Sequence, residues 1–218
     1  MVLDDDRGVS VYKEFSEKVF KYFDSELFRS EIPEAKKDYF EKIGQVFDDD
    51  NIFEMRMAAF FDWFVYDRPA GKIGLSPIRL YYYINENLLT PEEKITGTNL
   101  LKTNLSLFLI NKKTKDILSI IDLYDSTFYE VPSRREFDFI AVSSIVEGRL
   151  IPTRDGYVFS DPIYAYPTDV SAKIKKEALK YKNTTRGKFR EFIFKLAGMS
   201  IRSYRYKHLP VSEIYKFK

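Results

Sequence analysis

Apolar side chains recur every three or four residues through the first hundred positions, which is the spacing of one buried face on a helix. Proline at 33, 77 and 91 suits a first helical turn, and the hydroxyl residues that precede 77 and 91 can cap one. The predicted helices span about 11–28, 33–47 and 52–66, and two more begin at 77 and 91. We therefore expect residues 1–100 to form a helical domain.

The pattern changes after Asn99. Four runs there are short, rich in β-branched and aromatic residues, and separated by polar clusters: "LSLFLI", "ILSIIDLY", "TFYEV" and "FDFIAVSSIVEGRLIP". Asp155-Gly156 is a hairpin signal, because both residue types accept the backbone angles of a tight turn. These features predict four or five antiparallel strands over residues 105–164, arranged as a small sheet or half-open barrel in a β domain of residues 101–167.

Helical spacing returns in the last fifty residues. Thr168 and Asp169 open one run, "DVSAKIKKEALKYKN", and Thr185 can cap a second, "RGKFREFIFKLAGM". The final stretch is expected to be partly helical and broken near Pro210. Residues 168–218 are thus predicted to be basic C-terminal helices. Helices followed by a sheet and then by helices describe an α+β protein.

The composition excludes several kinds of chemistry. The chain has no cysteine and one histidine, His208, which excludes disulfides, thiolate catalysis, zinc fingers, iron–sulfur ligation and multi-histidine metal sites. Asp48-Asp49-Asp50-Asn51 lacks the alternating carboxylates and mid-loop glycine of a calcium loop, so we interpret it as an interhelix loop. We expect no metal, no cofactor and no catalytic residues. Since no secretory signal and no apolar run of membrane-spanning length is visible, we expect a cytoplasmic protein.

Charge is distributed unevenly along the chain. Residues 170–218 hold 14 Lys or Arg against three Glu, a net charge of +11, so residues 1–169 carry −9. Such polarity predicts either an anionic partner for the tail or docking of the tail onto the acidic body. Interleaved cations and tyrosines are typical of single-strand nucleic-acid binding. The anion or nucleic-acid candidates are Lys176, Lys180, Arg186, Lys188, Arg190, Arg202, Tyr204, Arg205, Tyr206 and Lys207.

The stretch "FFDWFVYDRP", residues 60–69, is the densest aromatic block of the chain. Asp62 and Asp67 lie about 140° apart on a continued helix, so they are not expected to act as a pair. Buried charges persist when they are paired, so we expect one of them to bind a nearby cation such as Arg68 or Arg79. Asp62, Trp63, Asp67 and Arg68 are accordingly predicted to form a structural corner rather than a catalytic site.

The same block and three later stretches carry a family resemblance. Together with "LSPIRLYYYINENLLTPEE", "LSLFLINKKTKDILSIIDLYDSTFYEV" and "VEGRLIPTRDGYVF", it resembles a group of uncharacterised bacterial proteins in which a DWF-type helix precedes a small β domain. The likeness covers roughly residues 45–167. It implies a bacterial, intracellular protein and the domain order given above, and it carries over no activity and no catalytic residue.

The leading functional hypothesis is a non-enzymatic regulatory protein, an adaptor that binds another protein, because tyrosine excess and split charge suit an interaction surface. The first alternative is nucleic-acid binding through the Tyr/Arg-rich C-terminal helices. The second is a carboxylate-dependent enzyme, for which Asp122, Asp125, Glu130 and Glu147 are available in the β region. The sequence leaves the partner, the process and the oligomeric state open.

Overall fold

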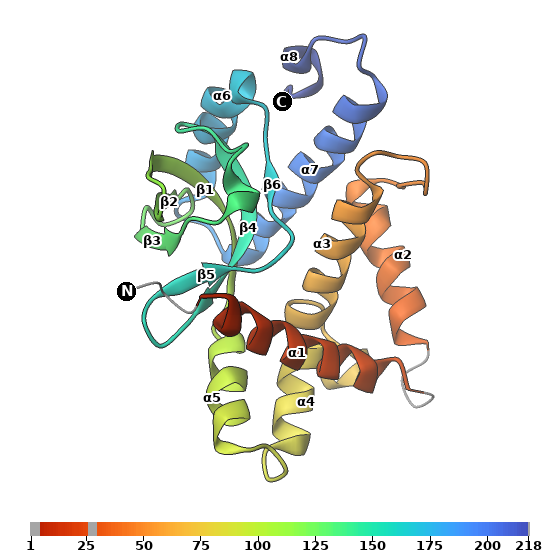
Figure 1. Cartoon of the computed structure of the whole chain (residues 1–218). Coiled ribbons are helices and arrows are strands. Elements are labelled where there is room, and N and C mark those ends of the chain that lie inside the picture. The colour runs from red at the N-terminus through yellow and green to blue at the C-terminus, as the bar shows by residue number, and fades with distance from the viewer. Residues whose placement is uncertain (1–4, 26–29, 218) are drawn as a thin grey trace.

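The computed structural model describes residues 5–25 and 30–217 and shows helices around a small sheet (Figure 1). The N-terminal helices are α1 (Asp5–Phe23), α2 (Glu31–Ile43), α3 (Phe53–Tyr66), α4 (Pro77–Asn85) and α5 (Pro91–Leu100). The C-terminal helices are α6 (Thr168–Ala178), α7 (Arg186–Arg205) and α8 (Val211–Ile214). Short 3-10 turns lie between these elements: η2 (Gly71–Ile73), η3 (Arg135–Phe137) and η4 (Leu179–Tyr181).

The middle of the chain forms one antiparallel sheet. Its strands are β1 (Asn104–Lys113), β2 (Ile117–Asp122), β3 (Phe128–Pro132), β4 (Ile145–Pro152), β5 (Tyr157–Phe159) and β6 (Tyr164–Ala165). The strand order is β3-β2-β1-β4-β5, and β6 also pairs with β4. Tyr129 of β3 and Tyr157 of β5 meet edge to face, with ring centroids 4.8 Å apart, so the sheet curls into a nearly closed barrel. The α+β prediction is confirmed.

Alternation along β1 divides its side chains between two cores. Leu107 faces α6 and α7, where it packs with Val170, Ile174 and Phe189. Phe108, one residue later, points into the barrel with the apolar side chains of the other strands. Because successive strand residues point to opposite faces, one strand serves both cores.

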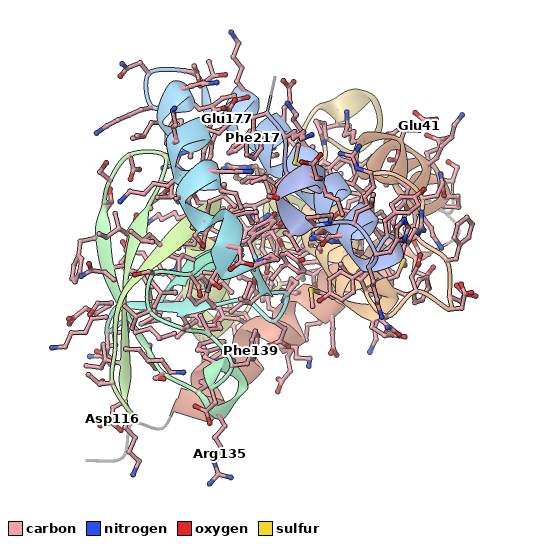
Figure 2. The ribbon with its side chains drawn as sticks, turned by 90° about the horizontal axis from the view of Figure 1, so that it is seen from above. Glu41, Asp116, Arg135, Phe139, Glu177 and Phe217 are labelled. Carbon is pink, nitrogen blue, oxygen red and sulfur yellow. The ribbon has the colours of Figure 1, made fainter. Side chains whose placement is uncertain are left out.

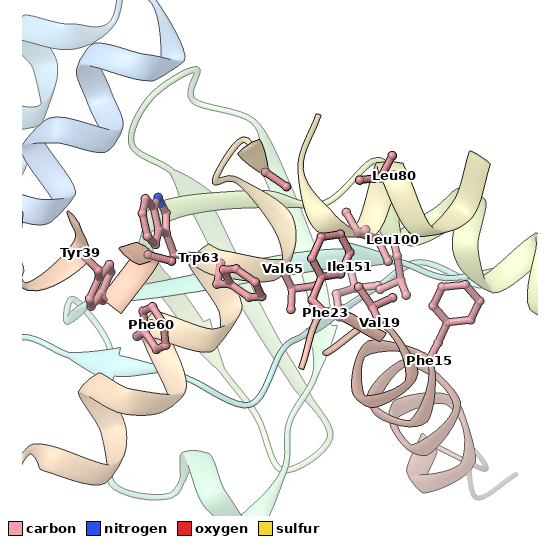
Figure 3. Close-up of a cluster of buried hydrophobic side chains, with 14 of the residues drawn as sticks. Phe15, Val19, Phe23, Tyr39, Phe60, Trp63, Val65, Leu80, Leu100 and Ile151 are labelled. Carbon is pink, nitrogen blue, oxygen red and sulfur yellow. The ribbon is translucent and has the colours of Figure 1, made fainter. Parts of the chain in front are cut away.

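A third core joins the N-terminal helices to the sheet. Figure 3 shows Phe15, Val19 and Phe23 of α1 beside Val65 of α3 and Ile151 of β4. At its other end, Trp63 packs against Tyr39 and against Phe194 of α7, with ring centroids 5.4 and 6.1 Å apart. Side chains from all three predicted segments thus share this core, and their division into domains stays a prediction.

The N-terminal helices and the sheet lie on opposite sides of the molecule (Figure 2). Seen from above, Figure 2 places Glu41 of α2 and Asp116 of the β1–β2 turn at opposite ends. Figure 1 shows α4 and α5 as an adjacent pair that projects from the lower side, away from α6 and α8. Within the described part of the chain, no helix is both long enough and apolar enough to cross a membrane.

Three local predictions need correction. The first helix begins at Asp5 and ends at Phe23, and positions 26–28 of the prediction lie outside the described residues. Of "FDFIAVSSIVEGRLIP", the strand takes 145–152, while the preceding apolar residues close over the barrel as η3 and a loop. Asp155-Gly156, which the sequence marks as a tight two-residue hairpin turn, lies in a four-residue connection between β4 and β5, where the Thr153 amide donates to the carbonyl of Gly156.

Candidate functional site: an apolar pocket with a buried carboxylate

A cavity of about 460 Å³ opens where α1 and α3 meet the end of the sheet. Its walls are mostly apolar and come from segments that are distant in sequence. They include Phe20 of α1, Phe61 and Val65 of α3, Ile151 of β4 and Val158 of β5. The volume lies within the range of small-molecule sites, about 300–1,000 Å³. The pocket therefore has the size and lining of a binding site for an apolar ligand.

Asp62 is the buried charged side chain in the pocket wall. It belongs to α3, and its Oδ2 accepts a hydrogen bond of 2.7 Å from Nε of Arg149 on β4. Arg149 is 1% exposed and also donates to Asp67, directly after α3, and to Oγ1 of Thr103 at 3.1 Å. Asp67 is bound in addition by Arg190 of α7 at 3.0 Å. Two carboxylates and two guanidinium groups thus balance in charge behind the pocket.

Asp62 has hydrogen-bonding capacity beyond its contact with Arg149. Among the described residues, the well-formed hydrogen bond to the Asp62 carboxylate is the one from Arg149 to Oδ2, and the Ser160 hydroxyl is a second, less well aligned donor beside it. Burial raises the pKa of Asp62 above its ordinary value, although the charge and hydrogen bond of Arg149 act in the opposite direction. Ser160, which also lines the pocket, lies close enough to stabilise the carboxylate. The Ser160 hydroxyl itself is buried and, over residues 5–25 and 30–217, makes no hydrogen bond with acceptable geometry.

Tyr66 and Ser16 form the other polar part of the wall. Their hydroxyl groups lie 2.7 Å apart, and Ser16 also donates to the carbonyl of Tyr12 at 2.8 Å. The guanidinium of Arg149 lies over the Tyr66 ring, 4.6 Å from its centroid. Burial raises the pKa of Tyr66, so its hydroxyl stays protonated at neutral pH. At the rim, Lys13 of α1 pairs with Asp161 at 3.2 Å, and both side chains are more than half exposed.

A second buried ionic cluster lies behind the first. Arg56 of α3 is fully buried and donates to Glu147 of β4 at 3.1 Å and to Ser200 of α7 at 2.7 Å. Tyr166 donates to the other oxygen of Glu147 at 2.5 Å. A cavity of about 20 Å³, lined by both Asp62 and Glu147, separates the clusters and is large enough for one water molecule. The second cluster therefore braces α3, β4 and α7 from the inside.

The predicted corner is built differently from expectation. The prediction that Asp62 or Asp67 binds Arg68 or Arg79 is wrong, because both acids converge on Arg149 from the sheet. They can do so because α3 ends at Tyr66, which frees Asp67 from the 100° helical step. Arg68 instead binds Glu31 at 2.6 Å and Asp38 at 3.3 Å on α2. Trp63 is buried in the core next to this network.

The basic tail is largely folded onto the acidic body. Arg186 contacts Asp125 at 2.5 Å and Asp122 at 3.5 Å, and Arg205 contacts Asp50 at 2.6 Å. Arg190 belongs to the network behind the pocket, and Lys180 pairs with Glu177 on its own segment at 2.7 Å. Three of the four arginines in residues 170–218 are therefore bound to carboxylates of the body.

The remaining tail candidates lie on the surface. Lys176, Lys188, Arg202 and Lys207 are exposed and form no ion pair within the described part of the chain. Tyr204 and Tyr206 are 39% and 47% exposed, and the Tyr206 ring meets His208 edge to face. The structure thus does not gather the ten candidates into one site.

Sequence reasoning missed the pocket and named only one of the side chains at its polar end. Arg149 carries no local signal, since it sits within the strand "IVEGRLIP" like an ordinary outward-facing charge. A charged residue at a position where every neighbouring strand residue is buried would have been an indication, because such a charge needs a partner. In residues 5–25 and 30–217, no cluster of three or more His, Cys, Asp or Glu side chains could hold a metal ion.

The fold and the site define an α+β protein in which a helical layer and a nearly closed antiparallel barrel enclose an apolar pocket with an ionic base. Residues 8–197 match the model of a family of unknown function, DUF7986, and the chain belongs to that family. The match extends beyond the predicted likeness at residues 45–167 and includes most of α1 and the first part of α7. The comparisons found no similar curated protein and no similar solved structure.

Proposed function

We propose that this protein is a non-catalytic binding module for a small, mostly apolar molecule. The observation that carries the proposal is the 460 Å³ pocket, whose apolar walls converge on Asp62 and Ser160. An apolar cavity with a few convergent polar groups is the usual form of a ligand site. The charged pair at its base supplies orientation, and the walls supply most of the binding energy.

Binding fits the arrangement of acids better than catalysis does. Carboxylate catalysis of the common kind uses two acids on either side of the reacting bond. In the described part of the pocket, Asp62 is the buried acid, whereas Asp161 and Glu17 are exposed at the rim. Asp67 is turned away toward Arg149 and Arg190. The nearest buried acid, Glu147, faces only the 20 Å³ cavity and is already held by Arg56 and Tyr166.

The test is titration with N-phenyl-1-naphthylamine, an uncharged probe that fluoresces in apolar surroundings. Ala58 of α3 lines the pocket, so Ala58→Leu and Ala58→Phe should reduce probe binding progressively as the side chain fills the cavity. Ala172→Phe on α6 is the matched control, because Ala172 is exposed and lies outside the pocket lining. We expect saturable one-to-one binding of the probe to the wild type and to Ala172→Phe, and progressively weaker binding to Ala58→Leu and Ala58→Phe. Equal binding by the wild type and Ala58→Phe, with both folded by circular dichroism, would overturn the proposal.

A second function, binding of another protein, is favoured by the hairpin that α4 and α5 form. Four large apolar side chains of this hairpin are more than half exposed: Tyr83, Ile84, Leu88 and Ile95, with Leu88 at 81%. The exposed acids Glu86 and Glu92 lie among them in sequence, which suits a partner segment that is apolar with basic flanks.

Site-specific photo-crosslinking in the producing cell tests the hairpin. A benzophenone amino acid at Leu88 should yield a discrete adduct that Glu86→Lys/Glu92→Lys weakens. The same group at exposed Lys36 of α2 serves as control. Identical adducts from both positions, or adducts unaffected by the charge reversal, would refute this second function.

A further inference from the structure

We propose that the pocket selects a ligand whose polar head donates a hydrogen bond, an alcohol or a protonated amine on an apolar body, and that it rejects carboxylate and phosphate heads. This inference rests on the proposed function, because it names the ligand class of the same pocket. It follows from which polar atoms at the inner end of the pocket are occupied and which are free.

The first free group is an acceptor. Arg149 donates to Oδ2 of Asp62, and within the described residues this is the well-formed hydrogen bond that the carboxylate accepts. A carboxylate oxygen in the wall of an apolar pocket gains from an added donor, since a hydrogen bond to a charged acceptor is roughly twice as strong as a neutral one. Burial already disfavours the charged form of Asp62. A head that donates to Asp62 therefore stabilises the charged form of this acid.

The second polar group is the hydroxyl of Ser160, which helps to lower the pKa of Asp62 but makes no well-formed hydrogen bond in the part of the chain that the structure describes. It lies beside Asp62 in the same wall. A hydroxyl can donate and accept, so an alcohol could donate to Asp62 and accept from Ser160 in one position. A protonated amine would donate one hydrogen bond to the Asp62 carboxylate and another to the hydroxyl oxygen of Ser160. An acceptor-only head such as a ketone would pair with Ser160 and leave Asp62 unsatisfied.

An anionic head finds no available cation among the described residues at this end. The guanidinium of Arg149 lies behind Asp62 and is used by Asp62, Asp67 and Thr103. The cations that line the pocket, Lys13 and Lys21, are exposed on α1 at its rim, and Lys13 is paired with Asp161. A carboxylate placed beside Asp62 would face a like charge without a counter-ion, which raises its free energy.

The test uses four probes that share one apolar cage and differ in the head: 1-adamantylmethanol, 1-adamantylmethylammonium, 2-adamantanone and 1-adamantanecarboxylate. Each displaces N-phenyl-1-naphthylamine from the full-length protein at pH 7. We expect the alcohol and the ammonium to displace the dye at about tenfold lower concentration than the ketone and the carboxylate. Carboxylate or ketone binding as tight as that of the alcohol would overturn the inference.

Two variants connect the ranking to the atoms named. Ser160→Ala removes a hydroxyl that lies beside Asp62 without a well-formed hydrogen bond, so it should lower stability only slightly and weaken the alcohol several-fold. Asp62→Asn offers an amide donor, so it should narrow the gap between ketone and alcohol. A ranking unmoved by either variant counts against the inference. If the adamantanecarboxylate binds to the wild type and Lys21→Gln alone abolishes this binding, the polar head of the ligand lies at the rim. That outcome also refutes the inference. Dye binding that Ala58→Phe does not affect is the separate result that defeats the pocket itself.

Discussion

Replacing Arg149 by methionine removes the charge on which the base of the pocket depends and keeps a similar side-chain volume. Arg149 is 1% exposed, and its loss leaves Asp62 buried without a counter-ion, whereas Asp67 retains Arg190 at 3.0 Å. Breaking a buried ion pair from one side costs about 3–5 kcal/mol. Because one of the two acids keeps a partner, we expect Arg149→Met to lower the free energy of unfolding by about 3 kcal/mol, at the lower end of that range.

A double-mutant cycle separates the ionic effect from lost packing. In Arg149→Met/Asp62→Asn the orphaned charge is gone, so at least half of the lost stability should return. Urea unfolding followed by the fluorescence of Trp63 provides the measurement, because this is the single tryptophan of the chain and it is buried beside the network. An unchanged denaturant dependence would show that all variants unfold from the same native state.

The pH dependence gives an independent check on the cause. Burial already raises the pKa of Asp62, and without Arg149 its main opposing influence is gone. An acid whose pKa is higher in the folded state binds more protons when folded, so stability rises as the pH falls through that pKa. The deficit of Arg149→Met should therefore shrink as the pH falls from neutral toward the ordinary pKa range of an aspartate. In the pH range where Asp62 is protonated in the folded state but ionised in the unfolded state, the free energy of unfolding should change by about 1.4 kcal/mol per pH unit. The double variant lacks this carboxylate and should show no such slope.

The reasoning about this network would be refuted by either of two results. One is an Arg149→Met protein within about 1 kcal/mol of the wild type, which would place the pair in the weak class of exposed ion pairs. The other is a deficit that is independent of pH and unrelieved by Asp62→Asn. That outcome would assign the loss to packing of the arginine stem and to the contact with the Tyr66 ring.

Three further predictions concern the helical layer. Gly97→Ala should cost about 1–3 kcal/mol, because the new Cβ would lie 2.5 Å from a ring carbon of the buried Tyr82; Gly187→Ala, with nothing nearer than 3.7 Å, should be neutral or stabilising in the same urea assay. Thr90→Ala should cost about 1 kcal/mol, because Thr90 and Glu93 form a complete capping box on α5, and a loss below about 0.3 kcal/mol would contradict it. Lys18 of α1 and the backbone amide of Thr90 both donate to the Glu93 carboxylate, and together they lower its pKa from 4.5 to about 2. A depressed pKa contributes stability that is present above 4.5 and lost as the pH falls through about 2. The difference between wild type and Glu93→Gln in acid titration should therefore vanish near pH 2, and a constant difference would refute this cause.

The sequence predicted helix starts and strands where a short segment determines its own structure. The proline and hydroxyl pairs at Ser76-Pro77 and Thr90-Pro91 mark the starts of α4 and α5, and Thr90 and Thr185 cap α5 and α7 through their side chains. The Ser76 hydroxyl makes no capping hydrogen bond, so that part of the prediction is wrong. Period-two alternation and turn residues likewise located most of the strands. Such signals succeed because capping and turn formation involve residues within three or four positions of each other.

Long-range pairing could not be read in the same way. Arg149 lies 87 residues from Asp62 in sequence, and the small barrel brings it there by pairing β4 with β1. The docking of Arg186 and Arg205 onto acids of the body was one of two predicted outcomes for the tail, and only the packing of α7 decided between them at these positions.

By itself, the sequence determined the class of fold, the order of helices and strands, and the separation of a basic tail from an acidic body. The tertiary structure alone decided which charges meet, where the apolar walls leave a cavity, and which polar atoms in it are left free for a ligand. The physical reason is that secondary structure depends on contacts close in sequence. A pocket with a buried ion pair depends on how whole elements pack, which no local pattern encodes.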